Sequence, residues 1–200
     1  MSDRTRIVIA AAVGSVAVFV MATTLVHALW YAPDDSGATP AVVTATPAVD
    51  STADDYPVRL VVPTLAIDAA VQRVGITKKG SMGVPSNFTD VAWYRDGVTP
   101  GQYGSAVIDG HVDNGLGLSG VFKHLPDLAV GDSVYVVTVT GKRLHFVVDA
   151  VKVYSYEDVP ADVFAQSDVS RLNLITCEGK WVPKDRTYDH RLVVFTSLRE

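Results

Sequence analysis

A single thiol is the side chain in this sequence best suited to covalent chemistry. Cys177 is the only cysteine, and it closes the apolar run Leu172–Thr176. An ionised thiol is a strong nucleophile, whereas a buried thiol packs as an inert small hydrophobe. Because Glu178 and Gly179 follow at once, we expect Cys177 to lie where a strand opens into a loop. Reactive groups concentrate on loops that a rigid scaffold holds in place, which favours the nucleophile.

A histidine stands in a similar position on another predicted strand. His111 directly follows the segment Ser105–Gly110, whose apolar residues run into glycine. This pattern places the imidazole at the end of a strand. It gains functional weight only in combination with a thiol; alternatively, it is a structural residue bonded to Asp109 or Asp113.

An arginine supplies the third candidate. Arg191 stands at the predicted start of the last strand. It is either a member of the same site or a solvated charge at a strand start. Successive side chains of a strand point to opposite faces. Only one of His190 and Arg191 can therefore share a site with Cys177.

The elements that position these residues are short strands. Runs rich in β-branched and aromatic residues alternate with Gly, Pro, Asn and Asp, which is typical of a mainly β sandwich or barrel. A Thr-Gly-Lys turn at 140–142 predicts a hairpin. Short helical pieces are expected at Leu118–His124 and Glu157–Phe164. We predict a closed barrel of about eight strands, of which seven can be assigned: Val58–Val62, Ala69–Val74, Ser105–Gly110, Ser133–Thr140, Arg143–Tyr154, Leu172–Cys177 and Arg191–Leu198.

The N-terminal region predicts a membrane anchor. Residues 7–26 contain no charged side chain, and a bilayer core needs about 20 apolar residues as a helix. Arg4 and Arg6 precede the run, so residues 1–6 should be cytoplasmic, residues 7–30 a transmembrane signal anchor and the rest extracellular. The alternative is a cleaved signal peptide, although secretory apolar regions are shorter, roughly 7–15 residues. Residues 31–56 are rich in Ala, Thr and Pro and predict a disordered linker, leaving 57–200 as the catalytic domain.

Composition excludes several functional classes. The net charge is −5, and no basic stripe is present to neutralise phosphates, so a nucleic-acid partner is unsupported. A single cysteine rules out a disulfide framework or a Cys-rich zinc site. The phosphate-binding patterns GxxxxGK[ST] and GxGxxG are absent, as is the HExxH spacing of zinc proteases.

The three candidate residues lie in an ordered set of motifs that resembles the sortase family. The matching segments are 107–113 (VIDGHVD), 121–125 (VFKHL), 130–134 (VGDSV), 174–177 (LITC) and 191–195 (RLVVF). The resemblance spans about residues 58–198. Segments 92–97 (AWYRDG) and 104–107 (GSAV) are most similar to class F sortases, while Asp189–Leu192 and Glu178 leave classes D and E open.

This resemblance implies an enzyme with a defined reaction. Cys177 would attack an LPxTG-like C-terminal sorting signal of a surface protein between Thr and Gly. The thioacyl enzyme would then pass the protein to an amine of a cell-wall precursor or a pilin. The resemblance makes His111 the proton donor and Arg191 the charge stabiliser, places Thr176 along the substrate groove and requires no cofactor or metal. Two alternatives stay open: a different cell-wall cysteine transpeptidase, and a non-enzymatic membrane-anchored β-domain that binds a surface partner.

Overall fold

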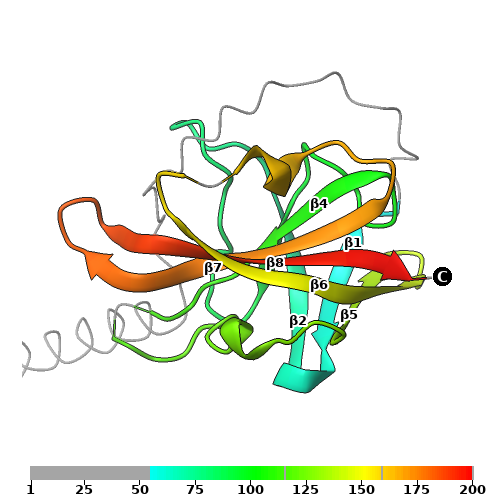
Figure 1. Ribbon diagram of the computed structural model, residues 1–200, viewed down its shortest axis with the longest axis horizontal. Helices are drawn as coiled ribbons and strands as arrows, with labels where there is room; N and C mark the ends of the chain where they lie inside the picture. Colours follow the sequence, from blue (N-terminus) through cyan, green and yellow to red (C-terminus); the bar gives the residue numbers. More distant parts are fainter. Residues whose placement is uncertain (1–54, 115, 159, 200) are drawn as a thin grey trace, which may run out of the picture. The chain divides into compact units, whose positions relative to one another are not determined.

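The computed structural model describes residues 55–199 except 115 and 159. Eight strands close into a barrel in the order β1-β2-β3-β4-β7-β8-β6-β5 (Figure 1). Neighbours pair antiparallel except β2 with β3 and β4 with β7, which pair parallel. The predicted mainly β barrel is thereby confirmed. In chain order the strands are β1 (Pro57–Val62), β2 (Ile67–Val74), β3 (Val91–Tyr94), β4 (Gly104–Asp109), β5 (Ser133–Thr138), β6 (Arg143–Ser155), β7 (Ser170–Val182) and β8 (Thr187–Arg199).

One strand, β3, was not predicted from the sequence. β3 is only four residues long and all four are buried, so it lacks the alternation of polar and apolar residues that marks a half-exposed strand. The predicted hairpin at 140–142 is confirmed, since β5 and β6 pair antiparallel on either side of it. Gly141 adopts a φ of 85° there, a conformation that glycine accepts without steric cost.

The barrel interior is filled by alternate residues of the strands. β5 shows the pattern clearly, because Val134 and Val136 are fully buried while Tyr135 and Val137 are half-buried. Phe122, from the segment between β4 and β5, is also fully buried and joins this core. An added Cβ on Gly110 would lie 2.5 Å from the Cδ2 atom of Phe122. The glycine before His111 is therefore required by packing.

The predicted helices are replaced by turns and short 3₁₀ helices. These are η1 (Pro63–Leu65), η2 (Leu125–Asp127) and η3 (Ala161–Phe164). Leu118–His124 forms no helix, because the backbone N–H groups of Gly120 and Phe122 donate to the carbonyls of Val112 and His111 instead of to a helical partner. Of Glu157–Phe164, only the last turn, after Pro160, is helical.

The predicted N-terminal segments, 1–6, 7–30 and most of 31–56, lie outside the described residues. Along the chain from 55 onward, the described helices are all too short or too polar to cross a bilayer. The first strand begins at Pro57.

Candidate functional site

The parallel pairing of β4 with β7 brings His111 to Cys177. The register ends with Asp109 opposite Ile175, and the backbone N–H of Gly110 continues it by donating to the carbonyl of Ile175 at 3.1 Å. Continued for two more residues, this register would set His111 opposite Cys177, on strand lines that lie about 4.8 Å apart.

Thr176 holds this junction together. Its side chain is fully buried, and its hydroxyl donates a 2.7 Å hydrogen bond to the carbonyl of Gly110. The hydroxyl thus ties the residue before Cys177 to the residue before His111. The predicted contact of Thr176 with a substrate stays a prediction.

Cys177 and Arg191 face each other across the β7–β8 ladder. They are direct Cα partners in an antiparallel pair, and directly opposed residues project to the same face of a sheet. Cys177 is half-buried and Arg191 is 7% exposed. The three candidate side chains therefore come from three adjacent strand lines.

Two sequence predictions about this hairpin were wrong. Cys177 does not end its strand and Arg191 does not begin one, because β7 continues to Val182 and β8 starts at Thr187. Glu178 still pairs with His190, and Gly179 and Lys180 then form a bulge opposite Asp189, at which the register shifts, rather than a loop. Gly179 has a φ of 87°, and a glycine in the left-handed region is a common means of bulging a strand without ending it.

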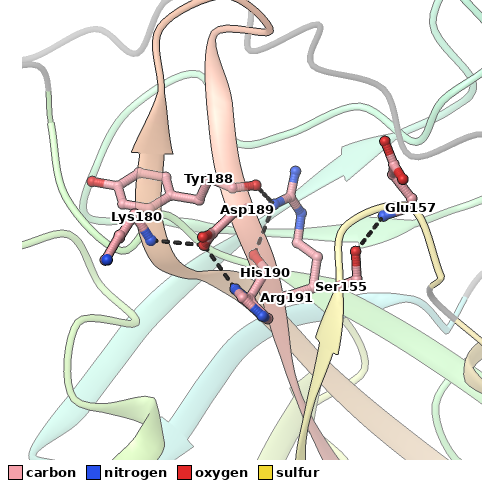
Figure 2. A network of polar contacts seen from close by, with 7 residues as sticks. All are labelled: Ser155, Glu157, Lys180, Tyr188, Asp189, His190 and Arg191. Carbon is pink, nitrogen blue, oxygen red and sulfur yellow. Dashed lines mark hydrogen bonds and ion pairs between the residues drawn. The ribbon is translucent and has the colours of Figure 1, made fainter.

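The Arg191 guanidinium is held by neutral acceptors (Figure 2). Its Nη1 donates to the carbonyls of Tyr188 and His190, both at 2.9 Å, and its Nη2 donates to the hydroxyl of buried Thr187 at 2.7 Å. The Tyr156 ring centroid lies 6.0 Å from its Cζ. No ion pair among residues 55–199, where described, involves Arg191. Its charge is positioned but is not neutralised by a carboxylate.

His190 belongs to a different network on the opposite face. Its side chain is 44% exposed, and its Nδ1 lies 2.7 Å from Oδ1 of Asp189. The same oxygen accepts the backbone N–H of Lys180 at 2.7 Å, so Asp189 spans the bulge in β7 (Figure 2). The hydrogen bond from His190 lowers the pKa of Asp189 below its ordinary value.

His111 is oriented by the segment before β3. Its Nε2 lies 2.9 Å from the carbonyl oxygen of Pro85, and its ring centroid is 5.1 Å from that of Phe88. A carbonyl only accepts hydrogen bonds, so this contact places a hydrogen on Nε2 and leaves Nδ1 as the nitrogen that could exchange a proton.

Comparison with known families supplies the decisive observation. The sortase domain family matches residues 60–199. The chain belongs to the sortase family. Sortases are cysteine transpeptidases, and the described barrel carries the Cys, His and Arg side chains on adjacent lines. None of the curated proteins matches this sortase.

Solved sortases share the fold. Sortase C-1 from Actinomyces oris is 22% identical with a TM-score of 0.53, over 71% of this chain and 72% of that one. A lid mutant of sortase A from Corynebacterium diphtheriae is 21% identical with a TM-score of 0.56, over 74% and 72%. The sortase D5 transpeptidase of Clostridium perfringens is 19% identical with a TM-score of 0.53, over 71% and 78%. The class F assignment stays a prediction.

Sequence reasoning missed the residues that support this sortase site. Thr187 was overlooked because β8 was expected to start four residues later. Extending the strand backwards with period two puts Thr187 on the face of Arg191, and that parity was available in the sequence. Tyr188 donates a 2.6 Å hydrogen bond to Asp113, a pairing across 75 residues that no local pattern indicates.

The described part of this sortase has no group of three or more His, Cys, Asp or Glu residues that could hold a metal ion. The basic groups of the site are instead positioned by backbone carbonyls and a hydroxyl.

Proposed function

We propose that this sortase cleaves an LPxTG-like C-terminal sorting signal between Thr and Gly and transfers the protein to a cell-wall or pilin amine. The observation that supports this most directly is the cross-strand pairing of Cys177 with Arg191, beside the parallel register that leads to His111.

The first step is acyl transfer to sulfur. The Cys177 thiolate attacks the Thr carbonyl carbon, forming a C–S bond and a tetrahedral oxyanion. Collapse breaks the C–N bond, and His111 gives its Nδ1 proton to the departing amine of Gly. A free thiol is only a few per cent ionised at pH 7, and a positive charge on Arg191, the cross-strand partner of Cys177, would favour the thiolate.

The second step reverses the first with a new amine. The acceptor amine attacks the thioester carbonyl and gives its proton to His111, and the C–S bond breaks to regenerate the Cys177 thiolate. No oxidant, reductant or metal is needed to balance either step.

Arg191 is suited to the charge that develops in both steps. A guanidinium has five N–H donors, and the three hydrogen bonds to Tyr188, His190 and Thr187 use three of them. Two N–H groups are left to donate to an oxyanion, from a group whose rotation is already restricted. Such preorganised donors are often the largest single contribution to catalysis.

The membrane arrangement and the class are further parts of the proposal. We propose that residues 7–30 anchor the chain with its N-terminus inside, that 31–56 form a linker and that the barrel acts outside the cell. The segments 92–97 and 104–107 favour class F, with D and E as alternatives.

Cys177→Ala tests the reaction most directly. The variant should lose all cleavage of sorting peptides while keeping its thermal unfolding temperature, because a thiol on a half-buried site contributes little packing. Mass spectrometry of the full chain in detergent should detect a peptidyl adduct on Cys177 in the unmodified protein only. Undiminished turnover by the alanine variant would rule out the mechanism.

A further inference from the structure

The β7–β8 hairpin continues past the active-site pair and ends in an exposed turn. Beyond the bulge, Trp181 pairs with Tyr188 and Val182 with Thr187, and residues 183–186 form the turn. Figure 1 shows β7 and β8 running on together beyond the barrel. We call residues 180–186 the hairpin tip.

The hairpin tip combines an exposed aromatic ring with cations. Trp181 is 50% exposed, and it is followed by Val182 and Pro183. The tip carries three cations (Lys180, Lys184 and Arg186) and one carboxylate, a net charge of +2, on a chain whose net charge is −5. All three cations are exposed. Within the described residues none of them takes part in an ion pair.

Trp181 is held in place by the side chains around it. Its ring meets that of Tyr188 edge to face, with centroids 5.6 Å apart, and the Tyr188 hydroxyl is bonded to Asp113. The turn carboxylate, Asp185, accepts a 3.3 Å hydrogen bond from the Tyr156 hydroxyl. The apolar ring is therefore presented to the outside by a fixed support.

A second exposed apolar segment lies at the same end of the barrel. The loop that begins at Asp113 exposes Leu116 by 57% and Leu118 by 53%. Their backbone N–H groups both donate to the side chain of Asn114 at 2.9 Å. The Tyr188–Asp113 bond ties this loop to the hairpin.

We propose that the hairpin tip docks on the anionic surface of a phospholipid bilayer. Trp favours the membrane–water interface, where its ring is apolar and its N–H is solvated. Lys and Arg add attraction to anionic headgroups while their stems cover apolar surface. A fixed aromatic ring among unpaired cations, on an otherwise acidic chain, matches that surface in both charge and polarity.

Docking at the tip would place the active site close to the membrane. Trp181 is the fourth residue after Cys177, which is roughly 13 Å along a strand. The inference rests on the proposed location of the barrel at a membrane. It adds that the end carrying His111, Cys177 and Arg191 is the end that faces the lipid, where a lipid-borne amine acceptor would arrive.

Lipid quenching of tryptophan fluorescence tests this orientation. The full chain with Trp30→Phe is reconstituted into vesicles of phosphatidylglycerol and phosphatidylcholine that carry lipids brominated near the headgroup. Subtracting the signal of the Trp30→Phe/Trp181→Phe variant isolates Trp181, since Trp93 is only 4% exposed. Quenching of Trp181 should be strong in anionic vesicles and should fall when Lys184 and Arg186 are replaced by Gln, because each cation near such a surface contributes about fivefold.

A tryptophan at the other end of the barrel is the matched control. Tyr103 is 76% exposed and directly precedes β4, whose far end leads to His111. Tyr103→Trp in the chain without Trp30 and Trp181 should be quenched several-fold less than Trp181. Equal quenching at the two ends would overturn the proposed orientation.

The same vesicles separate failure of this inference from failure of membrane anchoring. If the chain floats with the vesicles but Trp181 is not quenched, docking of the hairpin tip is overturned while membrane anchoring stands. If the chain does not float, both docking and anchoring are overturned. Lys184→Gln/Arg186→Gln should leave cleavage of a soluble peptide in detergent unchanged. A several-fold loss there would assign the tip to peptide binding instead and contradict lipid docking.

Discussion

The two halves of the β7–β8 hairpin differ in burial and in the partners of their charges. In the inner half, up to the pair Cys177 and Arg191, most strand residues pack in the barrel, and the Arg191 guanidinium is nearly buried among neutral acceptors. In the outer half, beyond the bulge at Gly179, Trp181 and three cations are exposed. One continuous ladder thus carries the proposed active site at one end and the proposed docking surface at the other.

The bulge is the physical boundary between these halves. The register in which β7 pairs with β8 shifts at the bulge. The Asp189 carboxylate spans the bulge, because its Oδ1 contacts both the backbone N–H of Lys180 and the Nδ1 of His190. Changes in the inner half should therefore affect catalysis, and changes at the bulge should affect the stability of the hairpin.

The largest effect beyond loss of the thiol is expected at His111, the proposed proton donor. His111→Gln retains a hydrogen-bond donor but cannot transfer a proton, and general acid catalysis contributes roughly 10²–10⁴-fold. Amide cleavage should fall by that order, whereas cleavage of an activated thioester, whose leaving group needs no proton, should change little. Steady-state kinetics on the two substrates measures this. Similar losses on both would show that His111 only orients the site.

Arg191→Ala should reduce kcat by ~10²-fold or more, the order seen when an oxyanion donor is removed. The adjacent His190→Ala is the matched control, since its side chain lies on the opposite face and is 44% exposed. It should cost far less in peptide turnover assays. Equal sensitivity of the two residues would contradict the assignment of the active face.

Thr187 sharpens the comparison within the inner half. Thr187→Val removes the hydroxyl that accepts from Arg191 while keeping the side-chain shape, so kcat should fall about tenfold, the equivalent of ~1.4 kcal/mol in the transition state. Thr187→Ser restores the hydroxyl and should recover most of the activity, with KM little altered in both variants. If kcat falls as much in Thr187→Ser as in Thr187→Val, side-chain packing rather than the hydrogen bond to Arg191 would account for the loss.

The smallest effect on turnover is expected at the bulge itself. In Gly179→Ala a Cβ would lie 2.1 Å from Oδ1 of Asp189, on a residue with a φ of 87°, so unfolding free energy should fall by about 1–3 kcal/mol. Gly141→Ala has a similar φ but open space around it and serves as the control in thermal unfolding. An equal loss of unfolding free energy in both variants would show that the cost comes from the backbone conformation alone and not from the contact with Asp189.

The boundaries of the long strands were harder to predict than their existence. Seven of the strands were expected because β-branched runs between turn residues are a local signal. The ends of β7 and β8 were misjudged because a glycine such as Gly179 often marks the end of a strand. The contacts of Asp189 that span the bulge and keep the two strands paired are not visible in the sequence. β3 was missed because complete burial removes the alternation on which strand prediction depends.

The sequence by itself determined which side chains are available for chemistry, and strand parity determined that only one of His190 and Arg191 can share a face with Cys177. Both follow from residue type and from the two-residue period of a strand. The tertiary structure decided the rest: the parallel β4–β7 register that aligns His111 with Cys177, the carbonyl of Pro85 that fixes the His111 ring, and the Tyr188–Asp113 bond. These contacts join residues far apart in the chain, and their geometry depends on closure of the whole barrel, which no local pattern encodes.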